Sequence, residues 1–144
     1  MNFGLIGVAC VLGLAAIGSG IGAGIAGQAA IGAWKRNYLQ NKPASFLLVA
    51  YAGAPLTQTI YGFILMNALK TAAAAGKDPW LLLGLGILSG SAMGYSAVAQ
   101  GLASASSCDA FGETGKGFGQ YIIIVGLCET VALFVMAFTL GILG

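Results

Sequence analysis

The segment GLCETVALFVMAF, residues 126–138, contains one carboxylate, Glu129, in a run that is otherwise apolar or small. No other charged residue occurs between Gly117 and the last residue, Gly144. The whole stretch from Gly117 to Gly144 is long enough to cross a bilayer as a helix, for which roughly 20 apolar residues are needed. A carboxylate in the middle of such a helix is costly, so the sequence predicts that Glu129 has a function and a neutralising partner.

The composition indicates an integral membrane protein. Of 144 residues, 58% are hydrophobic and only 7% are charged, and the mean hydropathy is +0.92. A water-soluble domain carries about 25% charged residues. The net charge of +2 is too small to suggest a nucleic-acid partner, and the absence of histidine excludes histidine-based metal sites and catalytic triads. The cysteines lack CxxC spacing, which favours membrane packing over disulfides or zinc; they are Cys10, Cys108 and Cys128.

The charged residues divide the chain into apolar runs, each of which can span a bilayer once. Unpaired backbone is excluded from lipid, so the spans are predicted to be helices. The expected fold is an all-α membrane protein with four transmembrane helices in two tandem hairpins, residues 1–75 and 76–144. The runs are residues 1–34, 43–69, 79–108 and the segment that holds Glu129, and all six Lys and Arg are expected in loops. The apolar start, with no basic residue before Lys35, predicts a first transmembrane helix rather than a cleaved signal peptide.

The basic residues predict the orientation in the cell membrane. Loops 1–2 and 3–4 share a side and together hold four cations, against two in loop 2–3; these are Lys35, Arg36, Lys42 and Lys116, against Lys70 and Lys77. The positive-inside rule places the loops with four cations in the cytoplasm and both termini outside.

The two halves of the chain resemble each other. SGIGAG at residues 19–24 matches SAVAQG at residues 96–101, and LTQT at residues 56–59 matches LCET at residues 127–130. This register sets Gln58 opposite Glu129 and indicates a duplicated hairpin in which only the second copy kept its carboxylate. Ala23, not Gln28, corresponds to Gln100, so Gln28 is expected outside the site.

Small residues are dense in the first and third helices, and they allow membrane helices to approach closely. This pattern fits a simple four-helix bundle, but it favours an inner wall of closely spaced helices in a ring. The positions are Gly18, Gly20, Gly22, Gly24 and Gly27, with Ser89, Gly90, Ser91, Gly94 and Ser96.

These glycine-rich helices, Gln100 in VAQG, PLTQTIYG at residues 55–62 and the ET pair at Glu129 together resemble one family. It is the duplicated proteolipid ring protein (the c or K subunit) of vacuolar- and archaeal-type rotary ATPases, and most similar is the sodium-pumping bacterial kind. The resemblance implies a non-catalytic rotor ring of identical subunits surrounded by lipid. A membrane stator subunit would face Glu129 with an arginine. A soluble central stalk would contact loops 1–2 and 3–4 and couple rotation to ATP hydrolysis or synthesis in a separate sector.

The same resemblance implies an ion site on Glu129. Side-chain oxygens would come from Thr57, Gln58, Gln100 and Glu129, and a backbone oxygen from Ala54, while Tyr61 would hydrogen-bond Glu129 and hold it closed. The residues alone require that Glu129 be protonated, bound to a metal cation or paired with an arginine of another subunit. A permanently protonated glutamate in a static bundle is the structural alternative.

The expected ion is Na⁺, with H⁺ as a competitor. A protonated Glu129 needs only one or two hydrogen-bond partners, and further buried amides would add desolvation cost. A hard cation instead needs several oxygens to replace its water shell. The alternatives are a proton-carrying rotor of the same family, a small proton-coupled secondary transporter, or a structural proteolipid. No nucleotide-binding loop is present, so the chain is not expected to bind ATP.

Overall fold

The computed structural model describes residues 3–144, and in that part of the chain every regular element is a helix. A short 3-10 turn, η1, joins two of the helices into one continuous span, residues 48–74, so four spans are long and apolar enough to cross a membrane. The predicted all-α fold with four such helices is therefore confirmed. The elements are α1 (Phe3–Leu39), α2 (Leu48–Gly53), η1 (Ala54–Leu56), α3 (Thr57–Ala74), α4 (Pro79–Thr114) and α5 (Phe118–Leu143).

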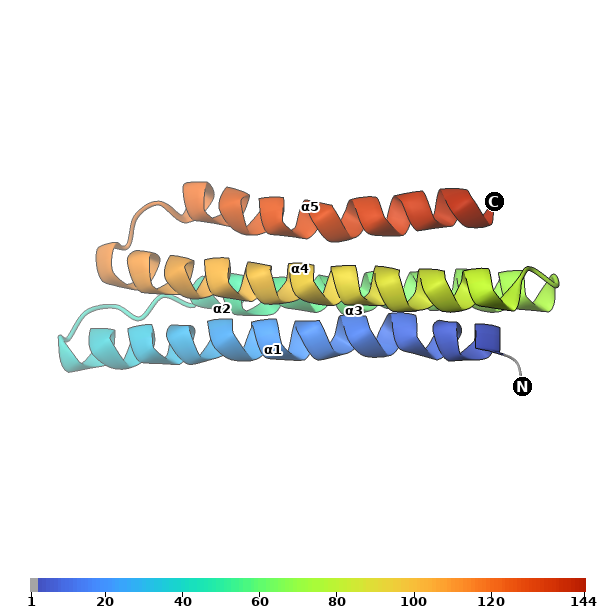
Figure 1. Ribbon diagram of the computed structural model, residues 1–144. Coiled ribbons are helices and arrows are strands. Elements are labelled where there is room, and N and C mark those ends of the chain that lie inside the picture. Colours follow the sequence, from blue (N-terminus) through green and yellow to red (C-terminus); the bar gives the residue numbers. More distant parts are fainter. Residues whose placement is uncertain (1–2) are drawn as a thin grey trace.

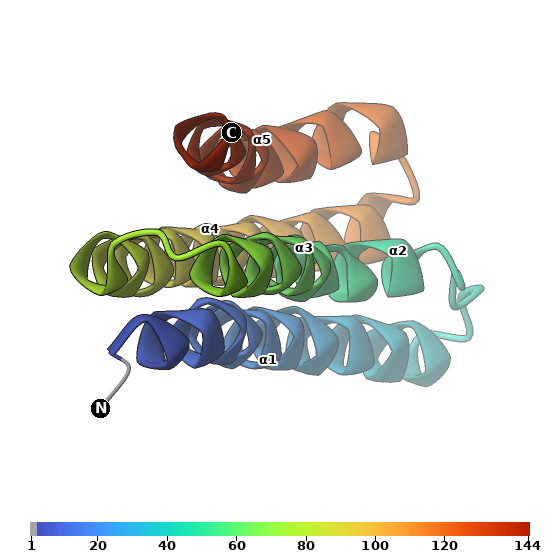
Figure 2. The same cartoon turned by 90° about the vertical axis from the view of Figure 1, so that its right-hand side faces the viewer.

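The spans lie side by side along one common direction (Figure 1). Helices α1 and α4 run the same way, and α2–α3 and α5 run the opposite way. Viewed from the end, α1 and α5 lie on opposite sides of α3 and α4 (Figure 2). The N-terminal end of α1, the C-terminus and residues 75–78 lie at one end of the molecule, the termini end. Residues 40–47 and 115–117 lie at the other, the loop end.

The helices extend further than the uncharged runs predicted. Helix α1 continues through Lys35 and Arg36, α3 includes Lys70, and α4 continues to Thr114 rather than ending near Cys108. The expectation that all six Lys and Arg lie in loops was therefore wrong for these three. A charge does not end a helix once the chain has left the bilayer. Residues that leave the helical conformation end it, as Gly115 does at φ 64° after α4.

Helices α1 and α4 meet backbone to backbone along a line of glycines. A Cβ added to Gly18 would lie 2.1 Å from the Gly94 carbonyl oxygen, and one added to Gly22 would lie 2.2 Å from the Ala97 carbonyl oxygen. Only glycine allows this approach. Gly20, by contrast, faces open space, as do Gly24 and Gly27. The glycines of α1 therefore serve two faces, of which one is covered by α4 and the other is uncovered in the single chain.

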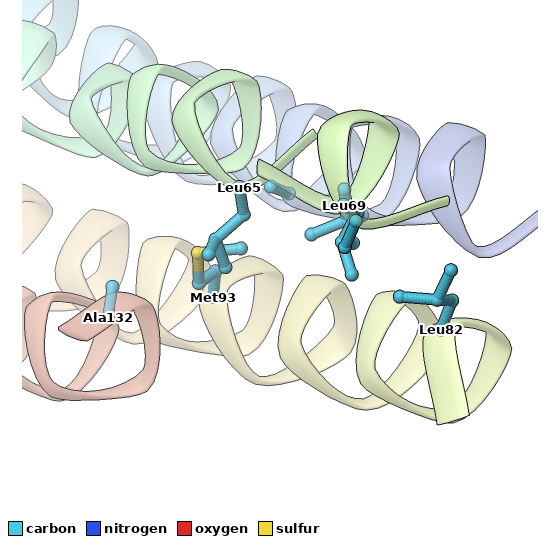
Figure 3. Packing of buried hydrophobic residues seen from close by; sticks show 8 residues of the cluster. Leu65, Leu69, Leu82, Met93 and Ala132 are labelled. Carbon is cyan, nitrogen blue, oxygen red and sulfur yellow. The ribbon is translucent and has the colours of Figure 1, made fainter. Parts of the chain in front are cut away.

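Two apolar clusters fill the interior, one toward each end. The cluster toward the termini end brings together Leu65 and Leu69 of α3, Leu82 and Met93 of α4, and Ala132 of α5, each at most 1% exposed (Figure 3). The cluster toward the loop end contains Leu48, Tyr51, Cys108, Phe111 and Val125. Three polar residues lie in the sequence between members of these two clusters: Gln58 on α3, Gln100 on α4 and Glu129 on α5.

Candidate ion-binding site

Glu129 lies on α5 and receives one hydrogen bond on each carboxylate oxygen. The Tyr61 hydroxyl of α3 donates to Oε1 at 2.5 Å. The Gln100 side-chain amide of α4 donates through Nε2 to Oε2 at 3.2 Å. Tyr61 and Glu129 are both half-buried, so the carboxylate is held by two neighbours and is still partly open at the helix surface.

Two buried glutamines lie behind the carboxylate. Gln58 and Gln100 are both 0% exposed. Gln58 Nε2 donates to Gln100 Oε1 at 2.7 Å, and Gln100 Nε2 donates to the Val125 carbonyl oxygen at 3.1 Å. Unpaired buried amides would each carry a desolvation cost, so this mutual pairing explains how both are accommodated in an apolar interior.

The 3-10 turn η1 brings backbone oxygen to the same place. Pro55 lies in this turn and supplies no backbone N–H. The Thr57 hydroxyl donates to the Ala54 carbonyl oxygen at 3.0 Å and lies 3.3 Å from Gln58 Oε1. The turn thus groups a carbonyl, a hydroxyl and an amide within five consecutive residues beside Gln100.

The structure brings all six residues of the predicted site into one connected hydrogen-bond network; they are Ala54, Thr57, Gln58, Tyr61, Gln100 and Glu129. Whether five of them bind an ion stays a prediction. Gln28, which was excluded, is exposed on α1.

One member of the network and one neighbouring contact were missed from the sequence. The Val125 carbonyl accepts from Gln100, and beside the network the Ser96 hydroxyl donates to the Cys128 carbonyl oxygen at 2.7 Å. A backbone acceptor has no sequence signature of its own. Val125 nevertheless precedes Glu129 by four residues, so helical spacing could have placed it on the same face. Ser96 belongs to the repeated motif that begins at Ser19, which was a usable signal.

No side chain within residues 3–144 supplies a positive charge to Glu129. The single ion pair of this described part joins Arg36 and Asp109 at 3.0 Å, at the loop end. A deprotonated Glu129 must therefore be neutralised by a bound cation or by another chain. The surrounding oxygens come from neutral amide, hydroxyl and carbonyl groups, so adding one monovalent cation to one carboxylate gives a neutral site.

Comparison with known proteins connects this geometry to a family. A family model that describes the C subunit of ATP synthase matches the chain twice, over residues 6–69 and 83–142. The chain is also 32% identical over 136 residues to the A-type ATP synthase subunit K of Methanocaldococcus jannaschii, with 91% of this chain and 57% of the relative covered. The chain thus spans little more than half the length of that relative. The two family matches fall on the two helical hairpins, in line with a duplicated chain.

Proposed function

The chain belongs to the family of the ATP synthase C subunit, and from this premise we propose that it is a non-catalytic rotor subunit that carries Na⁺ across the membrane on Glu129. One observation carries the proposal. The only carboxylate of the membrane-spanning interior has no cationic partner within residues 3–144 and adjoins a buried cluster of neutral oxygen ligands. Intramembrane carboxylates of this kind mark ion pathways.

The ligand set supports Na⁺ over H⁺. Carriage of a proton would use Glu129 and one hydrogen-bond partner, for which Tyr61 suffices. Two fully buried glutamines would then be retained without a use, although each carries a desolvation cost. Na⁺ would be bound by oxygens of Thr57, Gln58, Gln100, Glu129 and the Ala54 carbonyl, with Tyr61 holding the carboxylate in place. A proton would compete for the same carboxylate at low pH or low Na⁺.

The partners follow from the same premise. Identical subunits would form a ring through the uncovered glycine face of α1, and lipid would cover the apolar outer surface. The half-buried Glu129 would meet an arginine of a membrane stator subunit, which would replace the released ion. The loop end would contact a soluble central stalk, and rotation would be coupled there to ATP hydrolysis or synthesis in a separate sector.

The test of the ion is protection of Glu129 from a hydrophobic carbodiimide, which modifies a protonated carboxyl in the membrane. Na⁺ should protect Glu129, and the Na⁺ concentration required should rise as the pH falls, because both ions compete for one group. The exposed Glu113 is the matched control, since its labelling should not respond to Na⁺. Labelling of Glu129 that follows pH but ignores Na⁺ would assign a proton rotor.

The test of sidedness uses single cysteines at opposite ends of the molecule, in a background without the three native thiols. Gln40→Cys lies at the loop end and Ala75→Cys at the termini end, and both positions are exposed. If the loop end is cytoplasmic, a membrane-impermeant maleimide added to intact cells should label Ala75→Cys only. The reverse pattern would place the loops outside.

A further inference from the structure

We propose that the side-chain amide of Gln58 rotates by a half turn when the site takes up a cation, while the amide of Gln100 is kept in place by its hydrogen bond to the Val125 carbonyl oxygen. The inference rests on the proposed function, because it assigns Gln58 a separate role at the same site. The amide donors of the two glutamines run in one direction, from Gln58 to Gln100 and from Gln100 to Glu129. The Gln58 amide must therefore exchange the positions of its nitrogen and oxygen before a cation can be coordinated by oxygen atoms only.

The orientation of Gln100 is determined by its acceptors. Its Nε2 has two hydrogens, and two oxygens lie within reach, Val125 O at 3.1 Å and Glu129 Oε2 at 3.2 Å. If this amide were turned, its own oxygen would face a carbonyl oxygen and a carboxylate oxygen with no donor between them. Because Gln100 is 0% exposed, water is not at hand to relieve that contact. The Val125 carbonyl therefore holds Gln100 in one orientation.

The orientation of Gln58 is then set by Gln100, because the Thr57 hydroxyl on the other side of Gln58 can either donate or accept a hydrogen bond. Gln100 Oε1 is buried and needs either a donor or a cation, and Gln58 Nε2 supplies the donor at 2.7 Å. The other end of Gln58, Oε1, lies 3.3 Å from the Thr57 hydroxyl. The hydrogen bonds thus form a continuous set that runs from Thr57 through the two glutamines to the carboxylate.

A cation bound beside Glu129 makes the present orientation of the Gln58 amide unfavourable. Gln100 Oε1 can face the cation without moving, but Gln58 presents a partly positive amide nitrogen where an oxygen is needed. Rotation of the Gln58 amide by a half turn exchanges its nitrogen and oxygen with little change of shape. Its oxygen then points to the cation together with Gln100 Oε1.

This rotation leaves neither the nitrogen nor the oxygen of the Gln58 amide without a partner. After it, Gln58 Nε2 faces the Thr57 hydroxyl, which can accept that bond while it still donates to the Ala54 carbonyl oxygen at 3.0 Å. In both states the amide nitrogen and the amide oxygen of Gln58 therefore each have a hydrogen-bond partner or a cation, as two stable arrangements of a buried network require. Protonation of Glu129 places no positive ion beside Gln100 Oε1, so a proton should leave Gln58 in its first orientation.

The experiment is magnetic resonance of the membrane-embedded protein with ¹⁵N in the glutamine side-chain amides. The chain has five glutamines, at positions 28, 40, 58, 100 and 120. Gln58→Met and Gln100→Met each remove one signal and so assign it. Gln58→Asn keeps a buried amide, removes the same glutamine signal and so assigns it where the Met variant does not assemble. Gln28→Met removes an exposed glutamine outside the site and is the matched control.

Saturation with Na⁺ should shift the Gln58 signal strongly, the Gln100 signal less and the Gln28 signal not at all. Acidification without Na⁺ should leave Gln58 at its Na⁺-free position. If Na⁺ protects Glu129 from carbodiimide but Gln58 does not shift, or Gln100 shifts more, the inference is overturned and the proposed function stands. If Na⁺ neither protects Glu129 nor shifts any glutamine, both are overturned.

Discussion

The two hairpins place different side chains at equivalent positions, Gln58 in the first and Glu129 in the second, and these differ in exposure as well as in charge. Gln58 is 0% exposed, whereas Glu129 is half-buried at the surface of α5. At this position the first hairpin thus contributes an enclosed, neutral amide, and the second contributes a charge that is partly exposed. A duplicated chain can divide these roles, whereas a single hairpin would need one residue for both.

The largest effect is expected when the charge of the second hairpin is removed. Glu129→Gln makes its position equivalent to that of the first hairpin and leaves no anion to hold Na⁺. Insertion and assembly should persist, because a buried charge is removed rather than added, but ion transport by the complete ATPase should be lost. Na⁺ uptake into proteoliposomes measures this, with Asp78→Asn, at an exposed carboxylate of the termini end, as the control that retains transport. Uptake near the wild-type rate in Glu129→Gln would refute the assignment.

Moving the carboxylate to the first hairpin sharpens the comparison further. The double variant Gln58→Glu, Glu129→Gln keeps one acid next to Gln100 and should still bind Na⁺, although more weakly than wild type. Transport should stay lost, because position 58 is 0% exposed and an arginine of another chain cannot reach it. Radioactive Na⁺ binding and uptake, measured on the same preparation, separate the two properties. Recovered uptake would mean that exposure does not distinguish the hairpins.

A smaller effect, on stability, is expected at the glycine contact between α1 and α4, which joins the two hairpins. Gly18→Ala would place a Cβ 2.1 Å from the Gly94 carbonyl oxygen, so α1 and α4 must separate. Overpacking of this kind costs about 1–3 kcal/mol, and the unfolding temperature of the detergent-extracted protein should fall. Gly141→Ala on α5 faces open space and lies outside the uncovered glycine face of α1, so it serves as the control. Equal unfolding temperatures for the two variants would show that the backbones of α1 and α4 are not in close contact at Gly18.

The smallest effect is expected at the ion pair that joins the hairpins at the loop end. Arg36 and Asp109 are 3.0 Å apart, but the Asp109 side chain is 67% exposed. Exposed pairs contribute about 0–1 kcal/mol, so Asp109→Asn should change the unfolding temperature little and the change should vanish at high salt. A large loss that persists at high salt would indicate that this contact is needed for the hairpins to dock.

The site was more predictable than the helix ends. The lone acid in an apolar run, together with the repeat that aligned Gln58 with Glu129 and the family resemblance, was enough to select six residues that the structure brings together. The Val125 carbonyl was not predicted, because a backbone acceptor depends on packing between α4 and α5 and not on residue type. The loops were predicted too long because charge indicates the edge of a bilayer, whereas Lys35 and Asp109 show that a helix continues beyond it.

The unequal lengths of the helices have a mechanical consequence. Helix α1 has 37 residues and α4 has 36, whereas α5 has 26. At 1.5 Å per residue the two longer helices reach about 55 Å, well beyond a hydrocarbon core of about 30 Å. Their last turns therefore form a stiff projection whose backbone hydrogen bonds continue unbroken into the membrane. A torque applied at the loop end would be transmitted to the level of Glu129 through these two packed helices, because neither helix is interrupted on the way.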